Sequence, residues 1–190
     1  QALTAGRSVT FRDPFSQSWI QYGNASFDVA VDPMFLLDHL LEETEWTARA
    51  KALLPEGYSP GGYIVAQTTP GYIKDDFSVW VEGVAAVAKR TGLKVLLLPI
   101  CHFLFDEVLL ERAQAQLAVH GVSAEIVRGR VNVKDTAAVI GCSGGYCGTS
   151  LHGAVTAVAF GRPLAVLGHS MDGNLEGSLR AVGVNGAVTT

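Results

Sequence analysis

Short apolar runs alternate with longer helical patterns through most of the chain, and this alternation limits the folds that are open to it. The runs Tyr63–Gln67 and Lys94–Pro99 carry apolar side chains at most consecutive positions, not at every second one. Such runs are typical of strands that are buried on both faces of a parallel sheet, and helical patterns of about ten residues or more follow them. The sequence therefore predicts an α/β fold, a doubly wound parallel sheet of Rossmann-like type.

The individual elements follow from the same patterns. Helices are expected where apolar side chains recur at helical spacing and a glycine then ends the pattern, as at Gly92 and Gly121. The expected strands are Tyr63–Gln67, Lys94–Pro99, Ala124–Val127, Tyr146–Gly148 and Pro163–Leu167. The expected helices are Asp75–Arg90, Asp106–His120, Asn132–Ile140, Leu151–Phe160 and Asn174–Val182.

The first part of the chain has a different pattern. The expected elements there are a strand at Ser8–Phe11, a helix, a strand at Phe27–Val31 and an acidic helical segment at Asp38–Lys51. The first helix is expected to have Asp13 as its N-cap and Pro14 at its first position, to carry Phe15, Trp19 and Ile20 inward, and to end near Gly23. A strand–helix–strand unit of this size cannot bury its own apolar faces. We therefore expect residues 1–57 to be the tail of an N-terminal domain plus a linker helix, and residues 58–190 to be a C-terminal Rossmann-like domain. The linker is marked by a cluster of Pro55, Gly57, Pro60, Gly61 and Gly62.

Composition excludes several classes of protein. With 14 Lys and Arg against 18 Asp and Glu, the net charge is −4, which is too little positive charge for general nucleic-acid binding. No run reaches the roughly 18 uncharged apolar residues that a transmembrane helix needs. The 3 cysteines are too few for a disulfide framework and lack a zinc-ligand spacing, so reduced thiols and a cytoplasmic location are expected.

A glycine-rich turn provides the densest chemical signal. Between Gly141 and Gly153 the chain passes through a short strand, reaches Gly148, Thr149 and Ser150, and then enters a helix. Ser150 is a suitable N-cap, and the free N–H groups at a helix N-terminus favour a bound phosphate or carboxylate. His152, in the first helical turn, could donate a proton or a hydrogen bond to that anion. The alternative is that the glycines only permit close packing of the helix on the sheet and that His152 is structural.

Two further places could contribute to binding. His102 and Asp106 follow the strand Lys94–Pro99 and could form a polar pair at the rim of a cleft, although Asp106 could instead cap the next helix. Arg12, at the end of the first strand, could be held by Asp13 and directed across the cleft, since its planar guanidinium matches a carboxylate or a phosphate. The alternative for Arg12 is an ordinary surface pair with Asp13.

These segments resemble the polysaccharide pyruvyl transferase family. The resemblance rests on Ser8–Ser16, on Asp32–Leu37, on Gly148–Gly153, and on the continuation from Phe160 to Pro163. The segments follow the family's order over most of the chain. Many members carry arginine immediately before the Leu-His pair, whereas this chain carries Ser150.

The resemblance implies a two-domain architecture like that of the GT-B glycosyltransferases, with phosphoenolpyruvate as the donor in the cleft and no cofactor. It implies that His152 contacts the donor or acts as its acid, and that Arg12 holds its phosphate or carboxylate. The acceptor would be a sugar or a lipid-linked saccharide, and a peripheral association with the membrane is compatible with that acceptor. The isolated chain is expected to be inactive, because the acceptor half of the cleft would come from residues upstream of Gln1.

Two other functions remain open from the residues. One is a nucleotide-sugar glycosyltransferase or epimerase of GT-B type, for which Glu176 is the obvious residue to hold a ribose. The other is a non-catalytic module that binds an anion or a partner. The fold alone does not separate these alternatives.

Overall fold

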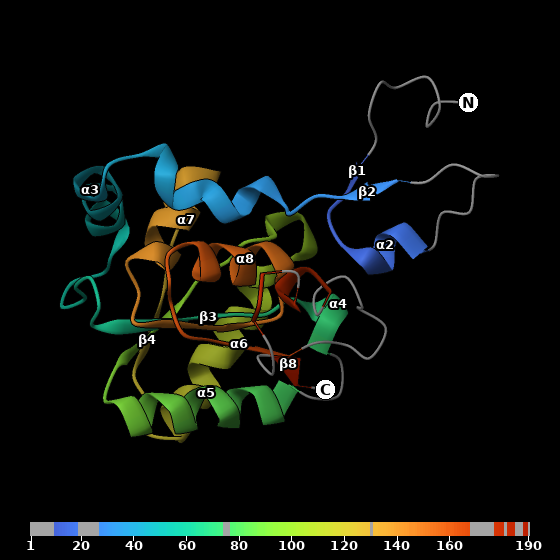
Figure 1. Ribbon diagram of the computed structural model, residues 1–190. Helices are drawn as coiled ribbons and strands as arrows, with labels where there is room; N and C mark the ends of the chain where they lie inside the picture. Colours follow the sequence, from blue (N-terminus) through green and yellow to red (C-terminus); the bar gives the residue numbers. More distant parts are fainter. Residues whose placement is uncertain are drawn as a thin grey trace.

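A parallel β-sheet forms the centre of the molecule (Figure 1). The computed structural model describes residues 10–18, 27–73, 77–129, 131–167, 177–180, 182–184 and 188–189. The strands are β3 (Tyr63–Gln67), β4 (Lys94–Leu97), β5 (Ala124–Ile126), β6 (Gly145–Gly148), β7 (Leu164–Leu167) and β8 (Val188–Thr189). They lie in the order β5-β4-β3-β6-β7-β8, and each neighbouring pair is parallel. The predicted α/β fold with a parallel sheet is confirmed.

Helices cover both faces of the sheet, as a doubly wound fold requires. Figure 1 shows α5 and α6 on one face and α7 and α8 on the other. Their bounds are α5 (Phe77–Thr91), α6 (Asp106–Val119), α7 (Val133–Gly141) and α8 (Leu151–Ala159). The chain leaves α5 and α6 through Gly92 and Gly121, both with φ of 71°, a left-handed conformation that glycine adopts without steric cost.

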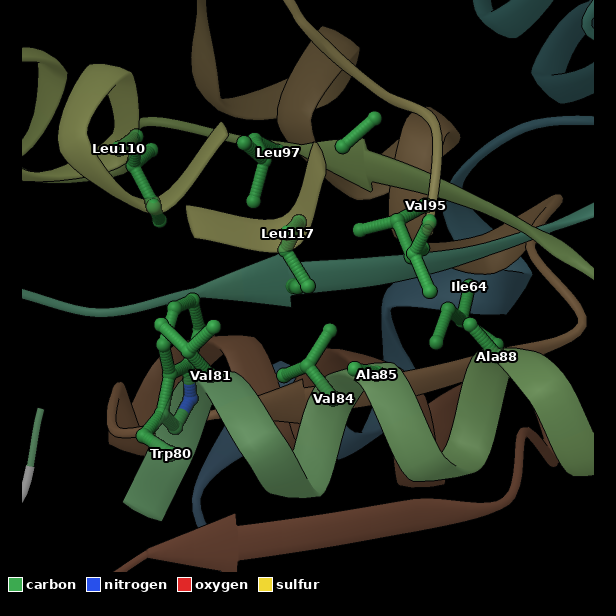
Figure 2. Close-up of a cluster of buried hydrophobic side chains, with 14 of the residues drawn as sticks. Ile64, Trp80, Val81, Val84, Ala85, Ala88, Val95, Leu97, Leu110 and Leu117 are labelled. Carbon is green, nitrogen blue, oxygen red and sulfur yellow. The ribbon is translucent and has the colours of Figure 1, made fainter. Parts of the chain in front are cut away.

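Strand β3 shows why its sequence is apolar at successive positions. Ile64 and Ala66 face the cluster formed with α5 and α6, whereas Tyr63 and Val65 face the cluster formed with α7 and α8. Figure 2 shows the first of these clusters, with Val84 and other side chains of α5 directed toward the strands. All residues of β3 are buried, as expected for a strand in the middle of a parallel sheet.

A third cluster lies on the outer side of α7 and α8. It is built by the 3₁₀ helix η1 (Pro33–Leu40) and by α3 (Glu43–Leu53), whose Trp46 is buried. Arg49 of α3 adds an ion pair, with its Nη1 2.9 Å from Oδ1 of Asp135 in α7. The predicted single helical segment Asp38–Lys51 is therefore wrong in its bounds. Asp32 caps a separate 3₁₀ helix, and the extended residue Leu41 (φ −140°, ψ 156°) separates that helix from α3.

The N-terminal strands form a small sheet of their own. Strand β1 (Thr10–Phe11) pairs in parallel with β2 (Asp28–Val29), and α2 (Pro14–Ser18) follows β1. Asp13 caps α2 as predicted, because its carboxylate accepts from the backbone N–H of Ser16 at 2.7 Å and from its hydroxyl at 2.8 Å. The predicted continuation of this helix through Trp19 and Ile20 to Gly23 lies outside the described residues.

Most other helices and strands begin and end within one or two residues of the predicted positions, and one helix was not predicted. A short helix, α4 (Pro70–Ile73), precedes α5, because Pro70 suits the first position of a helix. The predicted start of α5 at Asp75 and the predicted residues Asn174 and Glu176 lie outside the described residues. In the part of the chain that the structure describes, none of the helices has the length and apolar character that crossing a membrane demands.

Candidate functional site

The sheet changes its winding direction between β3 and β6. From β3 the chain proceeds outward to β4 and β5, and it then returns to place β6 on the other side of β3. Loops that leave neighbouring strands in opposite directions at such a point open a crevice at the carboxyl edge of the sheet. A cavity of about 340 Å³ lies there. It is lined by Arg12, Gln67, Thr69, Tyr72, Cys101, Phe103, Leu104, Thr149, Ser150, Leu151 and His152.

Gln67, the last residue of β3, organises the floor of this cavity. Its side chain is fully buried, and its Oε1 accepts hydrogen bonds from the backbone N–H groups of Thr149 at 3.3 Å and Ser150 at 3.0 Å. The hydroxyl of Tyr146 donates to the same oxygen at 3.2 Å, and Nε2 of Gln67 donates to Oδ2 of Asp106, also at 3.2 Å. Sequence reasoning missed Gln67. The available signal was a polar residue at the end of an otherwise apolar strand.

Asp106 lies beneath the cavity and does not pair with His102. Its Oδ2 also accepts from the backbone N–H groups of Ile100 at 3.1 Å and Cys101 at 2.9 Å. His102 instead contacts the carboxylate of Glu107 through Nδ1, and this hydrogen bond lowers the pKa of Glu107. The predicted pair of His102 and Asp106 is therefore wrong, because the carboxylate of Asp106 points inward and accepts from the preceding loop. The described lining of the cavity includes neither residue.

The N-terminus of α8 supplies donors to the cavity. The hydroxyl of Ser150 accepts from the backbone N–H of Gly153 at 3.2 Å, which confirms the predicted N-cap. The N–H groups of Leu151 and His152, in the first turn, have no acceptor within an α-helix and carry the positive end of its dipole.

Two residues that line this cavity carry buried hydroxyl groups. Thr69 is 3% exposed and Thr149 is 4% exposed, and within the described part of the chain the hydroxyl oxygen of each has no hydrogen-bond partner. Both residues line the cavity. Because a buried hydroxyl without a partner costs free energy, these groups are suited to donate hydrogen bonds to a ligand.

Arg12 and His152 meet at a shared carboxylate on the rim of the cavity. Oδ2 of Asp32 lies 3.7 Å from Nη1 of Arg12 and 3.9 Å from Nε2 of His152. Nε of Arg12 also lies 3.8 Å from Oδ2 of Asp13. Arg12 therefore both pairs with the neighbouring Asp13 and lines the cavity, which are the two roles that the sequence suggested for it. Asp32 was not predicted as a site residue, although it begins the segment Asp32–Leu37 on which the family resemblance partly rests.

The charge balance at this rim matters for what can bind. Asp13 and Asp32 offset much of the positive charge of Arg12. An anion in the cavity would therefore depend on the N–H groups of α8 and on the Thr69 and Thr149 hydroxyls as well as on the guanidinium. The imidazole of His152, at the rim of the cavity, is a group of the kind that can donate a proton to a bound substrate. The arrangement is therefore suited to anion binding and to acid chemistry.

Gly148 contributes through packing. A Cβ at Gly148 would lie 2.6 Å from Cζ of Tyr146 and 2.9 Å from the carbonyl oxygen of Gln67. A Cβ at Gly153 would also lie 2.6 Å from Cζ of Tyr146. The two glycines therefore allow the Tyr146 ring to fit between β6 and α8, which is the packing role considered above. The described cavity lining does not include Gly148.

The cysteines and the metal-ligating residues do not form a further centre in the described ranges. Cys101, Cys142 and Cys147 are free thiols, and burial raises the pKa of each, that of Cys147 to about 11. A search of the described residues finds no group of at least 3 His, Cys, Asp or Glu side chains that could hold a metal ion.

Comparison with known protein families identifies a relationship. A family model described as polysaccharide pyruvyl transferase matches residues 3–171 of the chain. This stretch contains every residue that lines the cavity. A comparison with curated proteins gives no match.

Proposed function

The chain belongs to the polysaccharide pyruvyl transferase family, and we propose that it transfers a pyruvyl group from phosphoenolpyruvate to sugar hydroxyls, with the cavity at the carboxyl edge of the sheet as the donor site. The observation that supports this most strongly is the combination, around one cavity, of the α8 N-terminus, Arg12, His152, and the hydroxyls of Thr69 and Thr149, which have no partner among the described residues.

The donor and the cavity have matching chemistry. Phosphoenolpyruvate carries a phosphate and a carboxylate on the same carbon atom. The N–H groups at Leu151 and His152, together with Thr149, suit one of these anionic groups. Arg12 suits the other, because its planar guanidinium can donate two parallel hydrogen bonds to a carboxylate or a phosphate. His152 then lies near the carbon skeleton between them.

The proposed reaction balances without a cofactor. His152 donates a proton to the methylene carbon, which becomes a methyl group and leaves an oxocarbenium-like centre at the adjacent carbon. One sugar hydroxyl adds to that carbon and loses its proton, which restores the proton given by His152. The carbon–oxygen bond to phosphate breaks, and a second hydroxyl closes the ketal. The proton of the second hydroxyl leaves with the phosphate.

The remaining features of the proposal follow from the family. The acceptor is a sugar or a lipid-linked saccharide, and the sheet domain forms one half of a GT-B-like cleft. The free thiols suit a reducing compartment, so we place the reaction in the cytoplasm, with peripheral association with the membrane where the acceptor is lipid-linked.

Thermal unfolding with added ligands tests the proposal. Phosphoenolpyruvate is expected to raise the midpoint of unfolding, because a ligand that binds only the folded state stabilises it. His152→Ala should remove that shift. His39→Ala, a control at an exposed histidine paired with Asp38, should leave the shift intact. Protection by a UDP-sugar with none from phosphoenolpyruvate would instead identify a nucleotide-sugar enzyme, and protection by neither would favour a non-catalytic module.

A further inference from the structure

An exposed aromatic turn borders the same cavity. The turn consists of η3 (His102–Leu104) and Phe105, and Phe103 within it is 80% exposed. Phe103 lines the cavity together with Tyr72 of α4, which is 42% exposed. Rings this exposed add little to the core. Exposed apolar side chains gathered at a cavity mark a surface that contacts a ligand.

The turn is held in place although its rings are not buried. Phe105 adopts a left-handed conformation (φ 61°, ψ 36°), and no other residue except glycine has positive φ in the described part of the chain. For a bulky side chain this conformation is unfavourable and persists only where surrounding contacts impose it. Those contacts are the carboxylate of Asp106 on the backbone before the turn and the His102–Glu107 pair across it.

The same buried network fixes the turn relative to the donor site. Gln67 bonds Asp106 through Nε2, and Asp106 holds the backbone that leads into the turn. Through Oε1, Gln67 bonds the N–H groups of Thr149 and Ser150, which lead into α8. The aromatic wall and the anion-binding wall of the cavity therefore share one rigid support.

We propose that Phe103 and Tyr72 form a stacking platform for a pyranose ring of the acceptor saccharide; this rests on the proposed function of the site. It places part of the acceptor site on this chain and so departs from the expectation that the whole acceptor half lies elsewhere. A pyranose ring presents C–H groups on its faces and hydroxyls around its edge. An aromatic ring covers such an apolar face while it leaves the hydroxyls free to hydrogen-bond. Because the platform and His152 line one cavity, a sugar stacked on the platform would lie in the same cavity as the donor.

The test compares two exposed phenyl rings on the same turn. Phe103→Ala removes the ring that lines the cavity, and Phe105→Ala removes one that is 69% exposed and lies outside the cavity lining. The probes are methyl β-galactopyranoside, methyl β-glucopyranoside and methyl α-mannopyranoside. Their ring protons are observed by saturation-transfer NMR with irradiation of the aromatic protons of the protein. Thermal shifts with phosphoenolpyruvate are recorded for the same variants.

In the wild-type protein, at least one glycoside is expected to receive saturation on its ring C–H protons. Phe103→Ala should raise the dissociation constant of that glycoside by about fivefold or more, Phe105→Ala should not change it, and Phe103→Trp should restore it. The shift with phosphoenolpyruvate should be the same in all of these variants. Equal losses of affinity in both alanine variants, or no saturation in the wild type, would overturn the platform. It would also be overturned if Phe103→Ala changed the oligomeric state and left glycoside binding unchanged. Glycoside binding that depends on Phe103 without any phosphoenolpyruvate shift would support the platform and refute the proposed donor.

Discussion

A single buried amide side chain, that of Gln67, connects the loops that form the walls of the cavity. Both polar atoms of this side chain are hydrogen-bonded, to Asp106 at the start of α6, to Tyr146 within β6, and to Thr149 and Ser150 directly after β6. A buried polar network in which these bonds are made supports one defined geometry, whereas a partly broken network is costly. The positions of Thr149 and Ser150 therefore depend on a residue that contributes almost no surface to the cavity.

Replacement of Gln67 by leucine tests this dependence. The Gln67→Leu variant should lose about 3 kcal/mol of unfolding free energy, because the N–H groups of Thr149 and Ser150 and the Tyr146 hydroxyl lose their acceptor. Gln114→Leu is the matched control, since Gln114 donates one hydrogen bond of 2.7 Å, to the carbonyl of Ala124, and its loss should cost about 1 kcal/mol. Urea denaturation measures both changes. Equal losses in the two variants would contradict the role given to Gln67.

At the scale of elements, β6 and α8 function as one unit around the ring of Tyr146. The ring is 1% exposed, and its hydroxyl is fixed by Gln67. Gly148 and Gly153 lie against it from the strand and from the helix. The short connection between these elements thereby places Thr149 to His152 at the cavity.

Two glycine substitutions are expected to have opposite effects. Gly153→Ala should destabilise the protein by about 2 kcal/mol, because the added methyl overlaps a ring that cannot move. Gly83→Ala, at an exposed position of α5 where an added Cβ has no neighbour within 4 Å, should stabilise by about 0.5–1 kcal/mol through its higher helix propensity. Thermal unfolding of both variants measures the difference. Stabilisation by Gly153→Ala would show that the ring is not held as described.

Most elements of the sheet domain could be predicted because their signals are local. A buried parallel strand such as Tyr63–Gln67 is apolar at successive positions, and glycine at Gly92 or Gly121 ends a helix. The division between η1 and α3 could not be predicted in the same way. It depends on how η1 packs against α8 while α3 packs against α7, and these are tertiary contacts.

The candidate site was predictable to a similar extent. Ser150, Thr149 and His152 follow a strand and begin a helix, so local sequence places them at the carboxyl edge. Gln67 and Asp32 were missed because their partners are distant in the sequence. His102 was assigned the wrong partner, since sequence spacing does not show that the Asp106 carboxylate turns inward while Glu107 faces outward.

At the scale of the whole molecule, an additional helical layer lies over one face of the three-layered sheet domain. Figure 1 shows η1 and α3 beside α7 and α8. Trp46 is 3% exposed, and its ring meets that of Phe160 edge to face at 5.2 Å. The segment from η1 to α3 is therefore packed against the sheet domain. Whether the chain divides into two domains near residue 57 can be tested by asking if both parts unfold in one cooperative transition.

Trp46→Ala addresses this question. The loss of a buried indole should lower the unfolding free energy by about 3–5 kcal/mol. It should shift the whole cooperative unfolding transition to lower temperature and should not produce a separate early transition. Val119→Ala, at an 86% exposed position at the end of α6, should change stability by less than about 0.5 kcal/mol. Circular dichroism and hydrogen exchange across β3 and β4 measure whether the loss extends to the sheet. An early transition confined to the first 57 residues would show that this segment folds separately.

The central claim is that the cavity at the β3–β6 switch point binds phosphoenolpyruvate, and isothermal titration calorimetry tests it most directly. Saturable binding at one site per chain is expected, and Arg12→Ala and His152→Ala should each weaken it strongly. Binding should be unaffected by Arg128→Ala, whose guanidinium pairs with Glu111 on the surface. Absence of binding, or binding that remains unchanged in both Arg12→Ala and His152→Ala, would contradict the account.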